Sequence, residues 1–389
     1  MLNKTHYISN LTPLRGIAAL LVAIFHFEMA IARFVPAKTT MFFEKSYLMV
    51  DLFFIMSGFI IFHVYGQSFK AAIGADDFRQ FIVARIARIY PLHFFTLALL
   101  IFMVIYVFPP GTYPNKMEFP SAIPSNFLLL QSFHVHSIYT WNIPSWSISA
   151  EFAAYLVFPF IALWIAKSPN RSKPILLVFT VAAYLSIMYL IPRYNPLNPN
   201  IPVPHNVNTT YDFGFLRGIA GFVAGVLLYQ FYSSDKIRRV FGSDFFAVGA
   251  ITAVVCALHF GLNDGVCVFF FAMIVLSFAC NRTFVAGICS WAPLQFLGLI
   301  SYSIYLMQIF FQEPFSKGWR LPGVTGFGRG KQNIGFGPGL LYCLVYLVLL
   351  IGVSTLSYYL IENPARKFIK RKWGNRKTDA DLRSELARV

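Results

Sequence analysis

Long apolar runs alternate with short polar loops along almost the whole chain of 389 residues. A helix needs roughly 20 apolar residues to cross the hydrocarbon core of a bilayer, which is about 30 Å thick. Runs of about this length recur ten times, although the eighth is short. They cover residues 16–32, 47–66, 89–108, 147–166, 175–192, 213–232, 245–262, 266–280, 294–313 and 338–361. The pattern predicts an all-α, polytopic integral membrane bundle of about ten transmembrane helices.

The basic residues in the loops predict how this bundle is oriented. With both termini in the cytoplasm, the cytoplasmic segments hold 22 lysines and arginines, and the opposite loops hold nine. Positive residues accumulate on the cytoplasmic side of membrane proteins, so this asymmetry favours an even number of helices with both ends inside. We expect residues 1–366 to form a single transmembrane domain and the charged residues 367–389 to form a cytoplasmic tail.

Composition supports the membrane assignment and narrows the choice of partners. Apolar residues make up 57% of the chain and charged residues 12%, against about 25% charged residues in a soluble domain. The net charge of +16 raises the question of nucleic-acid binding. The basic residues lie in short loops between apolar runs, where the positive-inside rule explains them better. We therefore expect a lipid bilayer around the protein and no nucleic-acid partner. The five cysteines lack zinc spacing, and we expect no metal.

Arg15 and His26 stand on one face of the first predicted helix. Eleven steps of 100° come to about three whole turns, which places the two side chains about 16 Å apart along the helix axis. An ionisable residue in hydrocarbon is costly and is usually functional. The pair indicates a fixed positive charge at the membrane surface and a proton-transfer group deep inside. A histidine that is hydrogen-bonded within the bundle fits His26 equally well.

Three further charged residues lie near the ends of the second and third predicted helices. Asp51 is close to the outer end of the second helix, where it is either a site residue or an interfacial cap. Arg85 and Arg88 are three residues apart on one helical face at the cytoplasmic surface. Guanidinium groups suit phosphates, whereas ordinary positive-inside anchoring explains the same two arginines without a ligand.

The fourth predicted helix carries Trp146 and Glu151 in its first two turns. In the predicted orientation, Glu151 lies at a depth similar to that of His26. A carboxylate at that depth needs a partner. It either orients or charge-balances His26, or it forms a structural pair with a buried base such as Arg217. Asp212 and Arg217 flank the outer end of the sixth helix and could share an outer cavity with His26 and Glu151.

These residues resemble a known family, membrane acyltransferase family 3. Six motifs occur in the order that is typical of the family, and together they span nearly the whole chain. The motifs are Arg15 to His26, Asp51 to Phe59, Arg85 to Pro91, Ser145 to Glu151, Ser301 to Leu306 and Glu362 to Pro364. This chain departs from many relatives at Gln308, where they carry a histidine.

The resemblance implies an activity and roles for particular residues. Members are largely bacterial, and they move acetyl or other acyl groups from cytoplasmic acyl-coenzyme A (acyl-CoA) to acceptors at the inner membrane. The resemblance implies an O-acyltransferase with acetyl-CoA as the donor and a hydroxyl of a carbohydrate or lipid-linked saccharide, such as an exopolysaccharide or lipopolysaccharide, as the acceptor. His26 is then the general base, assisted by Glu151, and Arg15, Arg85 and Arg88 hold the donor phosphates. The expected substrate-binding residues are Asp51, Trp146, Asp212, Arg217 and Gln308.

A proton-coupled secondary transporter or exporter of an anionic or glycolipid solute is the alternative. Ten helices, buried ionisable residues and interfacial arginines suit such a carrier. Transporters often contain inverted repeats, and this sequence shows no internal repeat. Acyl transfer from labelled acyl-CoA by the purified protein separates the two classes.

Overall fold

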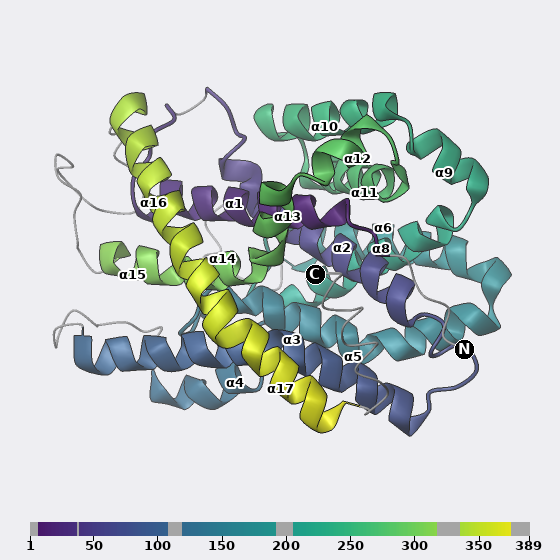
Figure 1. Ribbon diagram of the computed structural model, residues 1–389, viewed down its shortest axis with the longest axis horizontal. Coiled ribbons are helices and arrows are strands. Elements are labelled where there is room, and N and C mark those ends of the chain that lie inside the picture. Colours follow the sequence, from purple (N-terminus) through teal and green to yellow (C-terminus); the bar gives the residue numbers. More distant parts are fainter. Residues whose placement is uncertain (1–6, 37–38, 108–118, 192–204, 317–334, 375–389) are drawn as a thin grey trace.

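The computed structural model describes residues 7–36, 39–107, 119–191, 205–316 and 335–374. Within these ranges the chain forms helices and loops without a β-strand (Figure 1). The long helices are α1 (Leu11–Ala30), α2 (Met49–Tyr65), α3 (Ala75–Phe102), α5 (Ser145–Lys167), α6 (Pro169–Tyr189), α8 (Gly214–Tyr232), α10 (Asp244–His259), α11 (Asp264–Cys280) and α16 (Phe336–Ser357). The short ones are η1 (Glu44–Leu48), η2 (Met103–Val107), η3 (Pro120–Ala122), α4 (Ile123–Phe127), α9 (Asp235–Phe241), α12 (Phe284–Cys289), α13 (Ala292–Leu299), α14 (Ser301–Met307), α15 (Ile309–Ser316), η4 (Tyr358–Glu362) and α17 (Asn363–Trp373).

The helices have the length and composition that a membrane requires. In the described residues, seven helical segments are long and apolar enough to cross a bilayer on their own. The pair α9 and α10 passes only as one span bent by 67°, and α13 passes only together with the helix after it, at a bend of 52°. The short eighth run corresponds to α11, which has 17 residues. The predicted all-α, multi-pass membrane bundle is therefore confirmed, although the helices are unequal in length and two of the apolar helix pairs are sharply bent.

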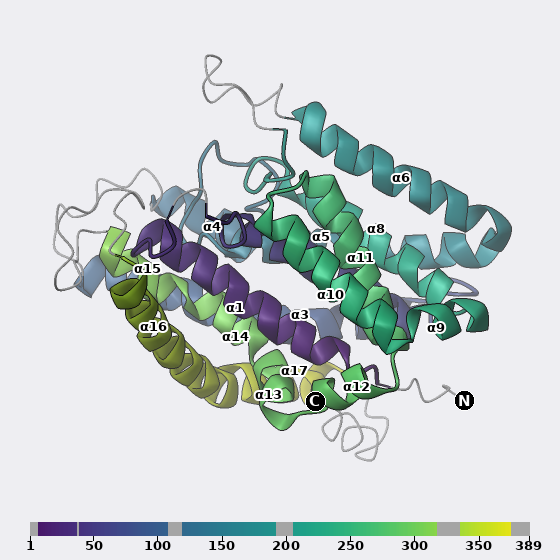
Figure 2. The same ribbon diagram turned by 90° about the horizontal axis from the view of Figure 1, so that it is seen from above.

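Helix α1 occupies the interior of the bundle. It contacts α2 and α11 and also α13, α14 and α16 from the last third of the chain. Figure 2 shows it between α16 on one side and α10 and α11 on the other. Small side chains allow this close approach, since Ala18, Ala19 and Ala23 are fully buried. The packing surrounds both Arg15 and His26 with other helices.

Glycines set the distance between the helices next to the candidate site. A Cβ atom at Gly58 of α2 would lie 1.9 Å from the carbonyl oxygen of Phe222 in α8. A Cβ atom at Gly225 of α8 would lie 2.0 Å from the carbonyl oxygen of Ile55. Neither position accepts a side chain unless the backbone shifts, so these contacts fix α2 against α8. Small residues commonly permit such close crossings in membrane bundles.

The last helical segment runs diagonally across the bundle (Figure 1). Helix α16 continues through the π-helical turn η4 into α17, which packs on α3. Residues 367–373 of the predicted tail are thus helical and lie against the bundle, whereas residues 375–389 lie outside the described residues. The division into a domain of residues 1–366 and a cytoplasmic tail stays a prediction.

Candidate active site

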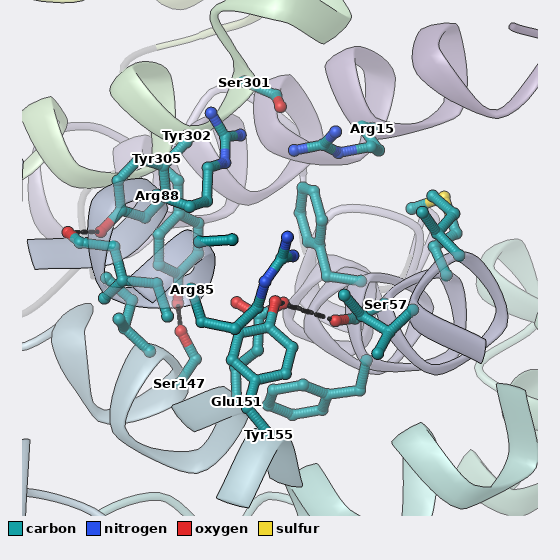
Figure 3. Close-up of a pocket in the computed structure, with 18 of the residues that line it drawn as sticks. Arg15, Ser57, Arg85, Arg88, Ser147, Glu151, Tyr155, Ser301, Tyr302 and Tyr305 are labelled. Atoms are coloured by element: carbon teal, nitrogen blue, oxygen red, sulfur yellow. Dashed lines mark hydrogen bonds between the residues drawn. The ribbon is translucent and has the colours of Figure 1, made fainter. Parts of the chain in front are cut away.

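A pocket with a volume of about 210 Å³ lies where α1, α2, α3, α5, α14 and α17 meet. Figure 3 shows that the three arginines labelled there point their guanidinium groups toward one another. With five cations and one carboxylate in its lining, the pocket is suited to an anion. No group of three or more metal-binding side chains occurs in the part of the chain that the structure describes. The charged lining residues are Arg15, Arg85, Arg88, Glu151, Arg366 and Lys370.

Two of these arginines lie three residues apart on α3 and have different partners. The Arg85 guanidinium donates to the Tyr65 hydroxyl at 3.2 Å, and its centre lies 5.1 Å from the centre of that ring. Arg88 forms an ion pair with Glu362, a fully buried residue of η4, and lies over the ring of Tyr302. Arg85 therefore rests on aromatic faces, which attract a cation without neutralising it. Its charge remains available to a ligand.

Glu151 belongs to this pocket and has different partners from those that the sequence indicated. Its Oε1 atom accepts hydrogen bonds from Ser57 at 2.7 Å and from Tyr155 at 2.6 Å (Figure 3). Among the described residues, no hydrogen bond or ion pair joins Glu151 to His26, the partner we expected, or to Arg217, the alternative. The reason is that α2 and the next turn of α5 already supply two hydroxyl donors to the carboxylate.

His26 lies deeper along α1 than Arg15 and does not line the pocket. Its Nδ1 atom lies 3.0 Å from the carbonyl oxygen of Val22 and 3.3 Å from Oε1 of Gln308. The amide nitrogen of Gln308 donates to the carbonyl oxygen of Tyr305 at 2.9 Å, which turns the amide oxygen toward His26. Both groups that face Nδ1 are acceptors, so we assign the proton of the neutral imidazole to Nδ1 and the lone pair to Nε2.

Helix α14 extends from the pocket to His26. Tyr302 and Tyr305 on this helix line the pocket, and Gln308, which caps the helix, contacts His26. The hydroxyl of Tyr305 lies 2.7 Å from the hydroxyl of Ser147 on α5 (Figure 3). The cationic pocket and the imidazole are therefore neighbours along one short helix, with this pair of hydroxyls between them.

Asp51 and Arg217 form a separate ion pair inside the bundle. The Oδ2 atom of Asp51 lies 2.5 Å from Nη2 of Arg217, and both side chains are 0% exposed. The guanidinium also lies 5.4 Å from the centre of the Trp146 ring. We expected these three residues to bind substrate, but in this structure they contact one another and tie α2, α5 and α8 together. Helices α2 and α5 contribute other residues to the pocket, whereas α8 contributes none. The side chains of Asp51, Trp146 and Arg217 do not line the pocket.

Asp212 stands in the loop before α8, away from the pocket. Its Oδ1 atom accepts a hydrogen bond from the backbone nitrogen of Thr210 at 2.7 Å, as short polar side chains do in turns. Burial, with a contribution from the Asp212 carboxylate, raises the pKa of Tyr211 to about 12. The Tyr211 phenol therefore stays protonated near neutral pH. Asp212 shapes the loop before α8.

The sequence analysis did not propose several polar and charged pocket residues as site residues, among them Ser57, Tyr155, Arg366 and Lys370. Ser57 precedes Gly58, and two small residues in a row indicate close helix packing rather than a binding site. Arg366 and Lys370 belong to a basic segment that has the composition of a helix exit. The spacing of Arg366 and Lys370 is a signal that could have identified this pair, because residues four apart share one face of a helix.

This chain is similar in sequence to several known proteins, and each match covers only part of the relative. YrhL of Bacillus subtilis (strain 168) is 25% identical over 393 aligned residues, which cover 94% of this chain and 56% of YrhL. The peptidoglycan O-acetyltransferase OatA of Listeria monocytogenes is 22% identical over 380 residues, 93% of this chain and 56% of OatA. The acyltransferase MdmB of Streptomyces mycarofaciens is 35% identical over 124 residues, 31% of this chain and 30% of MdmB. The chain thus spans about half the length of YrhL and OatA. No solved structure matches it with significance.

One protein family matches nearly the whole chain. The acyltransferase domain family matches residues 8–361, which include the pocket arginines of α1 and α3, His26 and Glu151. This match favours the enzyme over the carrier that we kept as the alternative. The protein is therefore a multi-pass membrane protein that belongs to the acyltransferase domain family.

Proposed function

We propose that the protein is a membrane O-acyltransferase that moves an acetyl group from cytoplasmic acetyl-CoA to a hydroxyl of a carbohydrate or lipid-linked saccharide. The observation that carries this proposal is the arrangement of a cationic pocket, α14 and His26 in one line. The name of OatA, a peptidoglycan O-acetyltransferase, supports acetyl as the group and a carbohydrate hydroxyl as the acceptor. We expect the bacterial inner membrane as the location, with both termini in the cytoplasm.

The donor side of this proposal rests on the charges of the pocket. Arg15 makes no hydrogen bond and no ion pair within the described residues, although it lines the pocket. Arg85 has no carboxylate partner in the same set. Guanidinium groups bind phosphate oxygens with charge-assisted, often bidentate hydrogen bonds. Arg15, Arg85 and Arg88 would hold the phosphates of the donor on the side that the loop charges predict to be cytoplasmic.

The acceptor side rests on the hydrogen bonds of His26. With its proton on Nδ1, the ring presents Nε2 as a base, and this atom has no hydrogen-bond partner in the described part of the chain. Nε2 would take the proton of the acceptor hydroxyl while the oxygen attacks the thioester carbonyl. The carbon–sulfur bond then breaks, and the coenzyme A (CoA) thiolate leaves and takes up a proton. A positioned base contributes about 10²–10⁴-fold to such a rate.

The distance between the two sides fits the shape of the donor. Eleven residues of α1 separate Arg15 from His26, which corresponds to about 16 Å along the axis. The pantetheine arm would span this depth past the hydroxyls of Tyr305 and Ser147. We place Glu151 as a positioning residue, because it orders the hydroxyls of Ser57 and Tyr155 beside the path of the donor.

Transfer from labelled acetyl-CoA by the purified protein in proteoliposomes tests this function. We expect labelled acetate on a carbohydrate acceptor such as a peptidoglycan fragment. Arg85→Ala should raise the KM for the donor about tenfold or more, since a charged hydrogen bond contributes about 1.5–3 kcal/mol. Arg85→Lys should recover only part of the loss, because lysine lacks the planar fork.

The matched control is Arg79→Ala, an exposed arginine of α3 that does not line the pocket. Its KM should equal that of the wild type. A wild-type protein that neither transfers nor hydrolyses acetyl-CoA would refute the proposed function. An equal rise in KM for Arg79→Ala and Arg85→Ala would show that the pocket is not the binding site of the donor.

A further inference from the structure

Helix α17 carries two pairs of basic residues on different faces. Arg366 and Lys370 are four residues apart and line the pocket. Lys367 and Arg371 have the same spacing, are exposed and do not line it. Adjacent residues of a helix differ by 100°, so the two pairs point in different directions. A stop signal at the membrane surface requires basic residues on this helix, but it does not require two of them to enter a pocket.

The charges around Arg366 favour an anionic ligand. Arg88 already has a buried carboxylate partner in Glu362. Neither Arg15 nor Arg366 forms an ion pair with any residue that the structure describes, and both are repelled by the charge of Arg88. Arg366 makes a long hydrogen bond, at 3.4 Å, to the side-chain oxygen of Asn363, and it also interacts with the Tyr358 hydroxyl and is attracted by the Glu362 carboxylate. A bound anion would offset this excess of positive charge.

The position of α17 indicates which part of the donor would lie there. The helix starts directly after the fully buried Glu362, but none of its own residues is buried. Arg366 and Lys370 therefore line the pocket from its more exposed side. The pocket lining also includes Tyr305, three residues before the glutamine that contacts His26. A donor with its thioester directed toward His26 would leave its nucleotide end beside α17.

We propose that Arg366 and Lys370 bind the phosphate monoester on the ribose of the donor and make the enzyme select complete CoA over thioesters that lack this group. The proposal rests on the proposed function in one respect, the use of acyl-CoA as the donor. A phosphate monoester carries about −1.5 to −2 charges near neutral pH. It offers several oxygens to a guanidinium and an ammonium group, which bind them as charge-assisted donors.

Equilibrium binding of CoA and of dephospho-CoA, which lacks only this phosphate, tests the proposal without an acceptor. The full-length protein is placed in nanodiscs of phosphatidylcholine alone and titrated calorimetrically with each compound. The wild type should bind CoA about tenfold to a hundredfold more tightly. The double variant Arg366→Gln, Lys370→Gln should lose this preference and keep its affinity for dephospho-CoA. The charge-preserving variant Arg366→Lys, Lys370→Arg should retain most of the preference, which excludes misfolding as the cause.

The matched control is Lys367→Gln, Arg371→Gln, which removes the same charge from the other face of α17. It should bind both compounds as the wild type does. Equal affinity of the wild type for the two compounds would overturn the proposal, as would an equal loss in the control. A preference that disappears when phosphatidylglycerol is added would assign the pair to lipid phosphates instead. If the preference is present but no acetyl group is transferred to any acceptor, the proposed function fails and the phosphate site stands.

Discussion

The Oε1 atom of Gln308 lies 3.3 Å from Nδ1 of His26, and the amide nitrogen of Gln308 is held by the carbonyl oxygen of Tyr305. The glutamine cannot turn its nitrogen toward the imidazole without losing that second hydrogen bond. It therefore presents an acceptor to Nδ1, and the carbonyl oxygen of Val22 does the same. In this chain an uncharged residue selects the histidine tautomer that leaves Nε2 free to accept a proton.

Replacement of Gln308 tests this relationship. Gln308→Leu should lower kcat about threefold to tenfold with little change in the KM for the donor, because one hydrogen bond of about 0.5–1.5 kcal/mol is lost. Gln308→Glu keeps an oxygen toward Nδ1 and should retain more activity than the leucine variant. The control is Gln312→Leu, one turn further along the chain. Steady-state kinetics with labelled donor measure both parameters, and equal kcat values in all four proteins would contradict the role of Gln308.

The buried pair of Asp51 and Arg217 should affect stability before activity. Asp51→Asn leaves an unpaired guanidinium in a site with 0% exposure. Breaking a buried pair in this way costs about 3–5 kcal/mol. The thermal unfolding midpoint in detergent should therefore fall well below that of the wild type. The double variant Asp51→Leu, Arg217→Met should recover a large part of the loss, because no charge is left without a partner. Unchanged unfolding combined with a raised KM for the acceptor would restore the substrate-binding role that the sequence suggested.

The crossing of α2 and α8 predicts different effects for two glycine-to-alanine changes. At Gly58 the new methyl group would overlap the backbone of Phe222, whereas at Gly249 of α10 nothing lies within 4 Å. Gly58→Ala should lower the unfolding midpoint and the yield of folded protein. Gly249→Ala should be neutral or stabilise the helix by about 0.5–1 kcal/mol. Similar midpoints for the two variants would show that α2 and α8 are not in close contact.

Sidedness follows from the loop charges and is measurable in cells. Val135, half exposed in the loop before α5, should face outward, and Asp76, exposed at the start of α3, should face the cytoplasm. After replacement of the five native cysteines, Val135→Cys should react with an impermeant thiol reagent in intact cells. Asp76→Cys should react only after lysis. The reverse labelling pattern would move the cationic pocket away from the cytoplasmic donor.

The helices were predictable because their signal is local. A run of about 20 apolar residues is a property of one segment, and in the described residues each predicted run falls on helical structure, although the run at 294–313 is divided among α13, α14 and α15. The break between α13 and α14 was not predictable in this way. It follows Gly298, where a Cβ atom would lie 2.0 Å from the carbonyl oxygen of Thr12, a residue of α1 that is far away in the sequence.

The partners of the site residues were not predictable either, because these contacts join residues that are far apart in the sequence. Arg85 and Arg88 were found from their spacing on one helix. By contrast, 94 residues separate Ser57 from Glu151, and 274 separate Arg88 from Glu362. Sequence reasoning therefore identified most of the ionisable groups but assigned Glu151 to the wrong neighbours. Only the packing of α2 against α5 and of η4 against α3 determines these pairs.

The central claim is that His26 acts as the base while the pocket holds the donor, and one comparison of two readouts tests it. His26→Gln keeps a side chain that forms hydrogen bonds but cannot take up a proton. In proteoliposomes this variant should bind CoA as the wild type does, and its rate of acetyl transfer from labelled acetyl-CoA should fall about 10²–10⁴-fold. Transfer at a rate close to that of the wild type, with CoA binding unchanged, would contradict the claim and make His26 a structural residue.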